Sequence, residues 1–231
     1  MNDVMINSAY FGLVLSLLAY YLGIKLKNKT KIALCNPLLI ATVLIIVLLM
    51  LLDIDYPTFN QGAQYLTYLL TPATVCLALP LYREFKILKD HLFIIFIALA
   101  AGCITCFVVV GGMALLWQID RTIGISLLPK SITTAIAIGL TEEVGGISGI
   151  TVAAVIITGI FASVIAPSIF KWFHINDPIA QGLALGASGH AIGTSKALEL
   201  GEIQAAMSSL AIVVTGILTV IIVPLAAPLF K

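Results

Sequence analysis

The sequence predicts an all-α polytopic membrane protein with about seven or eight hydrophobic segments, several of them interrupted or re-entrant. Two observations carry this prediction. Of the 231 residues, 61% are apolar and only 10% are charged, whereas a soluble domain has about 25% charged residues. The charged residues also gather in short clusters with long uncharged stretches between them. Because a soluble fold could not bury this much apolar surface, lipid is the expected solvent.

The uncharged stretches are the predicted spans, because a helix of about 20 apolar residues crosses about 30 Å of hydrocarbon. In chain order they are Asn7–Ile24, Pro37–Leu52, Ala63–Tyr82, Leu92–Trp117, Ser131–Leu140, Ile150–Phe173, Gly182–Ser195 and Ala205–Phe230. The fifth and the seventh are short. The sequence leaves open whether these two cross the membrane or re-enter it.

Lysines predict the orientation of the first spans. Lys25, Lys27, Lys29 and Lys31 follow the first stretch, and positive charge near the end of a span favours the cytoplasmic side. The N-terminus is therefore expected outside the cytoplasm. Its first residues carry no Lys or Arg, so no cleavable signal is expected. We expect a single membrane domain over residues 1–231.

Three segments interrupt the apolar pattern with polar residues, Gly and Pro. They are residues 69–74, residues 130–134 continuing to 141–146, and residues 182–196. Interrupted segments in corresponding places of two halves point to a transporter binding site. A weak internal repeat, in which residues about 115 positions apart correspond, supports a division of the chain into two repeat halves, about residues 1–120 and 121–231. It aligns Leu70 with Leu185, Leu77 with Ile192 and Glu84 with Glu199.

The interrupted segments supply the candidate substrate-binding residues. Hydroxyl groups and the N-termini of broken helices can hold an anion, and an ionisable group inside a span, such as His190, is usually functional. Small residues that only permit tight helix packing would explain the glycines equally well. The candidates are Thr71, Pro72, Thr74, Ser131, Thr133, Thr134, Ser188, Gly189, His190, Gly193 and Thr194.

Two acidic residues, Glu142 and Glu143, have two open interpretations. They could carry a coupling proton in a wet cavity, because a carboxylate in the hydrocarbon is costly. They could equally form an interfacial turn, which the following Gly145 and Gly146 would suit. Cys103 and Cys106 have no second cysteine pair and no histidine nearby. We therefore expect no metal, no cofactor and no catalytic site.

Several motifs resemble the LrgB/CidB family of bacterial membrane proteins over nearly the whole chain. They are residues 36–41 (NPLLIA), 70–75 (LTPATV), 130–134 (KSITT), 141–149 (TEEVGGISG) and 186–194 (GASGHAIGT). The resemblance implies a bacterial inner-membrane protein, often encoded beside a smaller LrgA/CidA-type membrane partner. It also implies one of two functions. Members are described as holin/antiholin-like regulators of murein hydrolases and autolysis, or as transporters of small monocarboxylates such as pyruvate, glycolate and glycerate. Lactate belongs to the same class of expected substrates.

The main functional prediction is a proton-coupled transporter of small monocarboxylates that works by alternating access. The alternative is a holin/antiholin-like modulator of murein hydrolase activity and autolysis. The interrupted segments favour the transporter, because a simple pore does not need them. The expected partners are a small organic anion, the lipid bilayer and further copies of the chain. Nucleic acid is not expected, because the net charge is only +1.

Overall fold

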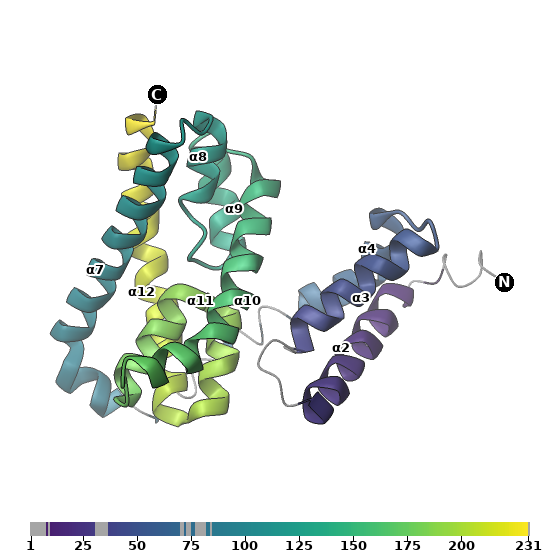
Figure 1. The fold of residues 1–231 in the computed structure, drawn as a ribbon, viewed down its shortest axis with the longest axis horizontal. Coiled ribbons are helices and arrows are strands. Elements are labelled where there is room, and N and C mark those ends of the chain that lie inside the picture. The colour runs from purple at the N-terminus through teal and green to yellow at the C-terminus, as the bar shows by residue number, and fades with distance from the viewer. Residues whose placement is uncertain are drawn as a thin grey trace. The chain divides into compact units, whose positions relative to one another are not determined.

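The computed structural model describes residues 8, 10–30, 37–69, 72, 75–76, 82–83 and 85–230, and these residues form helices and connecting segments without any strand (Figure 1). The chain divides into two compact units, residues 1–76 and 77–231. Each unit is described by itself.

The first unit contains α2 (Phe11–Thr30), α3 (Pro37–Leu51) and α4 (Tyr56–Tyr68). Glycines let α2 approach both partners closely. A Cβ at Gly23 would lie 2.6 Å from the carbonyl oxygen of Pro37 in α3, and a Cβ at Gly12 would clash with the carbonyl oxygen of Phe59 in α4. Small residues of this kind permit the close backbone packing that is common among membrane helices.

The second unit is built on three long helices, α7 (Phe85–Leu116), α10 (Ser148–Trp172) and α12 (Glu202–Ala226). Three stretches are long and apolar enough to cross a membrane, namely Lys89–Leu116, Ser148–Trp172 and Glu202–Leu229. The last of them is α12 together with the short 3-10 helix η1 (Ala227–Leu229). One apolar cluster joins Leu99 of α7 to Ala206 of α12, and another joins Ala114 to Val223. The earlier residue of α7 lies with the earlier residue of α12, and the later residue with the later one. The helices α7 and α12 therefore run in the same direction (Figure 1).

The helix α10 runs in the opposite direction to α7 and α12. Its early residue Val155 packs in the cluster of Ala114 and Val223, at the C-terminal ends of those two helices. Its late residue Phe170 packs instead with Leu185 of α11. The three spans therefore alternate in direction, as consecutive crossings of a membrane require.

A first helical hairpin, hairpin A, comprises residues 121–143. It contains α8 (Arg121–Leu127), the connecting residues 128–133 and α9 (Thr134–Glu143). The ten residues of α9 rise only about 15 Å, which is half of the hydrocarbon thickness. Hairpin A packs Ile125, Leu128 and Ile132 into the cluster at the C-terminal ends of α7 and α12. It therefore enters from that end and turns back.

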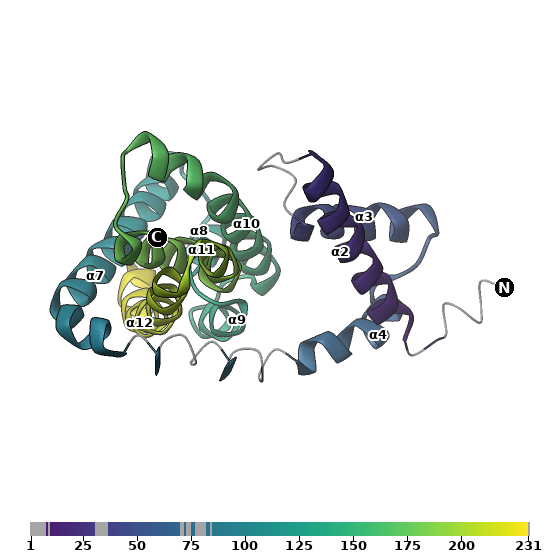
Figure 2. The ribbon, with the colours of Figure 1, turned by 90° about the horizontal axis from the view of Figure 1, so that it is seen from below.

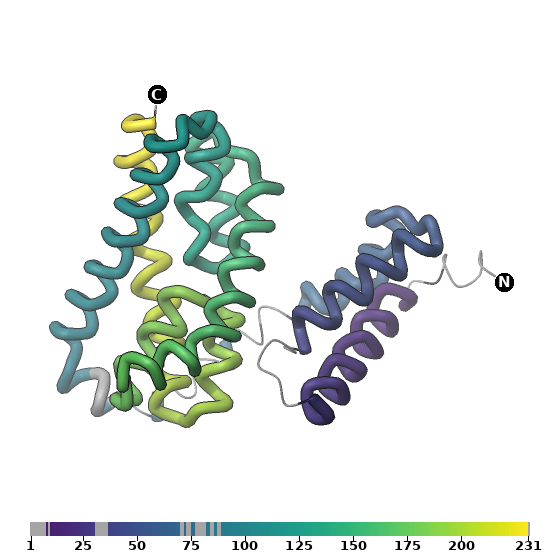
Figure 3. Tube along the Cα trace, in the orientation of Figure 1, coloured from purple at the N-terminus to yellow at the C-terminus, as the bar shows by residue number. Residues whose placement is uncertain are grey.

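A second helical hairpin, hairpin B, is α11 (Pro178–Leu200), which is broken at His190 (φ 41°, ψ −129°). Beyond the break the chain returns along itself, because a Cβ at Gly193 would clash with the carbonyl oxygen of Leu185 (Figure 3). Its first arm runs parallel to α12, since Gly182 lies against Gln204 and Gly186 against Ser208. Hairpin B lies between α10 and α12 (Figure 2).

The structure confirms some of the predicted spans and revises others. By length and composition, three of the predicted stretches qualify as spans, namely Leu92–Trp117, Ile150–Phe173 and Ala205–Phe230. The helix α3 is a shorter apolar helix. The two short stretches lie in hairpins rather than in straight helices: residues 131–140 form the tip and second arm of hairpin A, and residues 182–195 lie in hairpin B. Crossings by the remaining stretches and a total of seven or eight segments are not confirmed.

The predicted repeat and the single membrane domain remain predictions. The residues that the repeat compares in its first copy, Leu70, Leu77 and Glu84, lie outside the described residues. Within residues 77–231, however, the two hairpins enter from opposite ends of the α7–α12 pair. This arrangement places the two tips near each other and forms the candidate site.

Candidate functional site

A cavity of about 310 Å³, here called the tip pocket, lies where the two hairpin tips meet α7 and α12. Ligand sites are commonly about 300–1,000 Å³, so the tip pocket suits a very small molecule. It lies near the middle of the apolar stretches Lys89–Leu116 and Glu202–Leu229, since its α7 residues begin at Gly102 and its α12 residues are Thr215 and Thr219. In a spanning protein this depth is near the midplane of the bilayer.

Each hairpin contributes one of the predicted site residues to the tip pocket. Ser131 comes from hairpin A and Ser188 from hairpin B. The two serines are separated by more than fifty residues in sequence, and the two broken segments bring them to one cavity. The structure thus gives two of the three interrupted segments, residues 130–134 and 182–196, a shared hollow, as a binding site formed by both requires.

Lys130 is a further residue of the tip pocket, and the sequence prediction of the site missed it. Its side chain is half-buried, and its Nζ donates a hydrogen bond to Ser131 Oγ at 3.3 Å. Ser131 Oγ also lies 3.5 Å from Cys106 Sγ of α7. Among the described residues that line the pocket, Lys130 alone carries a charge. The available signal was that Lys130 is the only Lys or Arg between Arg121 and Lys171.

A second cavity, of about 480 Å³, adjoins the tip pocket between α7 and α11. The two cavities share Gly102, Ala184 and Ala187 as lining residues. The second cavity also reaches His91, near the start of α7, and Asp177. The Asp177 carboxylate accepts a hydrogen bond from the Ala180 amide at 2.8 Å and caps α11. This cavity therefore leads from the tip pocket toward the base of hairpin B.

His190 and Thr194 are buried in contacts that hold hairpin B together. His190 is only 3% exposed, and its Nε2 donates to the carbonyl oxygen of Val155 in α10 at 3.0 Å. Thr194 Oγ1 donates to the His190 carbonyl oxygen at 2.9 Å and lies 2.7 Å from Ser208 Oγ of α12. Neither residue lines the tip pocket.

Two of the predicted glycines, Gly189 and Gly193, are also buried in hairpin B. Gly193 permits the close return of the chain described above. Another glycine, Gly159 of α10, provides the space for the His190 ring, because a Cβ there would lie 2.8 Å from His190 Cε1. The geometry thus gives these residues a packing role. Their predicted role in substrate binding stays a prediction.

Hairpin A is fixed to α10 by a buried polar cluster that was not predicted. Ser126, Thr141 and Thr151 are all fully buried. Thr151 Oγ1 donates to the Ser126 carbonyl oxygen at 2.8 Å and lies 2.9 Å from Thr141 Oγ1. Ser126 Oγ accepts a hydrogen bond from the Ile147 amide at 2.7 Å. Because unpaired polar groups in the membrane interior are costly, this cluster ties the hairpin to the span.

Replacing Thr151 with valine is expected to destabilise the protein by about 1–2 kcal/mol, because the Ser126 carbonyl and Thr141 hydroxyl each lose a partner. Thermal unfolding of the purified protein in detergent measures the effect. The double variant T141V/T151V is expected to lose less than the sum of the two single variants. Strict additivity would show that the two hydroxyl groups do not interact.

The remaining predicted residues lie away from the tip pocket or outside the described residues. Thr133 and Thr134 begin α9 and are half-buried. Glu142 and Glu143 are exposed at the end of α9, where Ser148 Oγ donates to Glu142 Oε1 at 3.0 Å. They precede the start of the candidate span Ser148–Trp172, and both interpretations of this pair stay predictions. Pro72 is described in the first unit, whereas Thr71 and Thr74 are outside the described residues.

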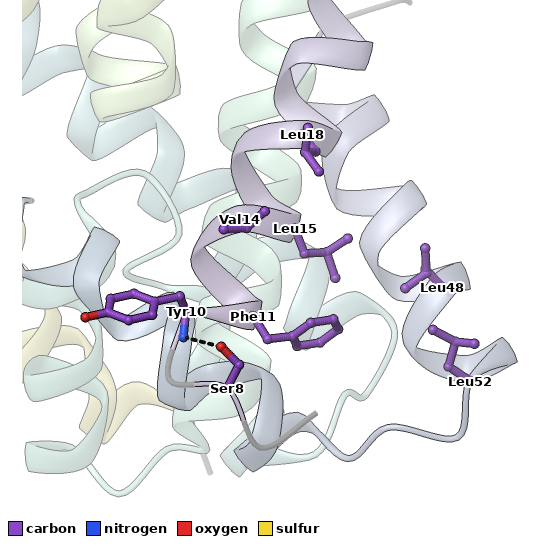
Figure 4. Close-up of a pocket in the computed structure, with 8 residues that line it drawn as sticks. All are labelled: Ser8, Tyr10, Phe11, Val14, Leu15, Leu18, Leu48 and Leu52. Atoms are coloured by element: carbon purple, nitrogen blue, oxygen red, sulfur yellow. Dashed lines mark hydrogen bonds between the residues drawn. The ribbon is translucent and has the colours of Figure 1, made fainter. Parts of the chain in front are cut away.

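A larger cavity, of about 520 Å³, lies in the first unit between α2 and α3 (Figure 4). Apart from Ser8 and the Tyr10 hydroxyl, its lining is hydrocarbon and aromatic, with Leu15, Leu18 and Leu48 among the residues drawn. Ser8 Oγ accepts a hydrogen bond from the Tyr10 amide at 3.4 Å. A cavity of this composition does not suit a small anion. Within the described residues, no group of three or more His, Cys, Asp or Glu side chains could hold a metal ion.

Comparison with known proteins gives one family. A family model described as "LrgB-like family" matches residues 16–229. Proteins named "Antiholin-like protein LrgB" from Bacillus mycoides (strain KBAB4), Bacillus cereus (strain B4264) and Bacillus anthracis (strain CDC 684 / NRRL 3495) are each 39% identical to this chain over 220 residues. The matches cover 95% of this chain and 96% of each relative. No solved structure matches the chain.

Proposed function

Because the chain belongs to the LrgB-like family, we propose that it is a multi-pass membrane protein that transports small monocarboxylates by alternating access through the tip pocket. One observation carries the proposal. Two hairpins that enter from opposite ends present Ser131 and Ser188 to one small cavity midway along the spans. A pore would not need two broken segments that converge on a compact site.

The lining of the tip pocket supports a short carboxylate as the substrate. Lys130 supplies an ammonium donor for a carboxylate. The Ser188 hydroxyl donates to the Ala184 carbonyl oxygen in the structure, and on substrate binding it would turn its hydrogen to the carboxylate. Phe107, Val109 and Leu128 supply an apolar wall for a short carbon chain. The adjoining cavity toward Asp177 supports access from the base of hairpin B. In the proposed cycle, the route at the base of hairpin B closes. Movement of hairpin A then opens a route from the tip pocket to the other side of the membrane.

The finer features of the prediction belong to the same proposal. Glu142 or Glu143 would carry the coupling proton at the exposed turn after α9, and Thr133 and Thr134 would line the path. The protein would reside in a bacterial inner membrane with its N-terminus outside the cytoplasm, as a homo-oligomer. A smaller LrgA/CidA-type membrane protein would be its partner.

The second candidate function is that of an antiholin-like modulator of murein hydrolase activity and autolysis. The printed names of the three relatives favour it more directly than transport, since each is called antiholin-like and none is called a transporter. The two functions are compatible if carboxylate flux changes the state of the cell wall indirectly. A test of whether the purified protein transports one small solute selectively distinguishes the two functions.

Purified protein in liposomes is expected to take up pyruvate, glycolate or lactate with saturation. Ser188→Ala is expected to raise the KM about tenfold, because a hydrogen bond to a charged ligand is lost. Radiolabelled uptake at several concentrations measures this. Ser195→Ala is the matched control: Ser195 lies in the same hairpin and, like Ser188, donates to the carbonyl oxygen four residues earlier, but it does not line the tip pocket.

Two outcomes would count against the transporter. The first is the absence of saturable uptake of any of the three acids into wild-type liposomes under proton or substrate gradients. The second is equal release of trapped dyes of several sizes, as a pore gives. Release of this kind, together with altered autolysis in cells, would support the second candidate instead.

A further inference from the structure

We infer that Lys130 is the residue that binds the substrate carboxylate, and that its single charge restricts the tip pocket to monoanions. The inference rests on the proposed transport function. It concerns a residue that is not among the site candidates from the sequence, and it is argued from the charge, position and partners of that residue.

The first step concerns the charge of the tip pocket. Lys130 alone is charged among the described residues that line the cavity, and within the described part of the chain it forms no ion pair. The one hydrogen bond that its ammonium group donates goes to the neutral hydroxyl of Ser131 at 3.3 Å. An ammonium group midway along the spans without a counter-charge is energetically costly. A bound anion would supply that counter-charge.

The second step concerns the position of Lys130. It lies in the connecting residues of hairpin A, where the backbone is non-helical between α8 and α9. Non-helical backbone at membrane depth is tolerated where it lines a cavity. Ser188 faces the same cavity from hairpin B. An anion held by Lys130, Ser131 and Ser188 would therefore contact both hairpins at once, so that its binding and release are linked to their movement.

The third step concerns selectivity. One ammonium group neutralises one carboxylate. A dicarboxylate would place its second charge in a small cavity whose other walls include Phe107, Val109 and Leu128, and burial of an unpaired charge is strongly unfavourable. A neutral analogue would leave Lys130 without a counter-charge. The pocket is therefore expected to bind a short monoanion in preference to either.

Transport by lysine variants tests the inference. Lys130→Gln is expected to raise the KM for pyruvate at least about tenfold, whereas Lys130→Arg, which keeps the charge, stays within about threefold. Lys171→Gln is the matched control, because Lys171 is an exposed lysine in the last turn of α10. An unchanged KM in a folded Lys130→Gln protein would overturn the inference, even if wild-type transport is normal. Absence of wild-type uptake would instead remove the proposed function.

Alkylation of Cys106 provides a second test on the unaltered protein, which does not depend on the folding of a variant. Cys106 Sγ lies 3.5 Å from Ser131 Oγ, beside the proposed carboxylate position. Pyruvate is expected to slow the reaction of Cys106 with N-ethylmaleimide, whereas succinate and methyl pyruvate are expected to leave its rate unchanged. Mass spectrometry of peptides measures the rate of alkylation. Equal protection by pyruvate and its neutral methyl ester would show that charge does not hold the ligand and would overturn the inference.

Discussion

Gly193→Ala is expected to destabilise the protein by about 3 kcal/mol, at the upper end of what overpacking costs. The added Cβ would clash with the carbonyl oxygen of Leu185 in the first arm of hairpin B. A backbone atom cannot rotate away as a flexible side chain does, so the two arms would have to separate. Separation would also disturb the buried contact between Thr194 and Ser208. Thermal unfolding in detergent and the yield of monodisperse protein measure the effect.

Gly112→Ala is the control for this change. Gly112 lies in α7, and a Cβ there would meet no atom within 4 Å. Alanine also favours a helix over glycine by about 1 kcal/mol, so this variant is expected to be as stable as the wild type or slightly more stable. Equal unfolding temperatures for the Gly193 and Gly112 variants would contradict the close return of hairpin B.

His190→Ala is expected to destabilise the protein by about 3 kcal/mol, through the lost ring contacts and the lost hydrogen bond to Val155. The backbone adds a second effect. His190 has a φ of 41° and a ψ of −129°, a conformation that costs a residue with a Cβ about 1–3 kcal/mol and that glycine adopts readily. His190→Gly is therefore expected to be more stable than His190→Ala, although it removes the same ring. Thermal unfolding of both variants measures this order.

The KM of the same variants separates a structural role of His190 from a role in binding. If the ring only holds hairpin B against α10, the folded fraction of His190→Ala is expected to transport pyruvate with a KM close to that of the wild type. A KM raised as strongly as in Lys130→Gln would show that the ring contacts the substrate, as the sequence first suggested. If His190→Gly is less stable than His190→Ala, the described turn at residue 190 is wrong.

The spans of the second unit and the existence of broken segments could be predicted from the sequence. Long uncharged stretches identify α7, α10 and α12, because their apolar composition is a local property. The interruptions around Ser131 and Ser188 are visible in the sequence for the same reason. The reversal of the chain in each hairpin is not visible there, since it depends on Gly193 meeting Leu185 and on the packing of Ile125 and Ile132 against distant helices.

The roles of individual polar residues were harder to predict, because each depends on a partner from another part of the chain. His190 is a candidate from the sequence because ionisable groups in spans are usually functional, but its partner, the Val155 carbonyl, lies 35 residues away. Lys130 is not a candidate from the sequence, because its importance follows from a cavity that four separate elements form. Thr151, which ties hairpin A to α10 through Ser126, gave no local signal.

The single lysine of the tip pocket has a consequence for the response of the protein to voltage. A potential of 100 mV across the bilayer changes the energy of one elementary charge by about 2.3 kcal/mol. A monoanion bound at Lys130 makes the loaded site electrically neutral, whereas the empty site retains one positive charge. The electric field would therefore act mainly on the return of the unloaded protein. In a cell with a negative interior, it would draw the vacant site toward the cytoplasm.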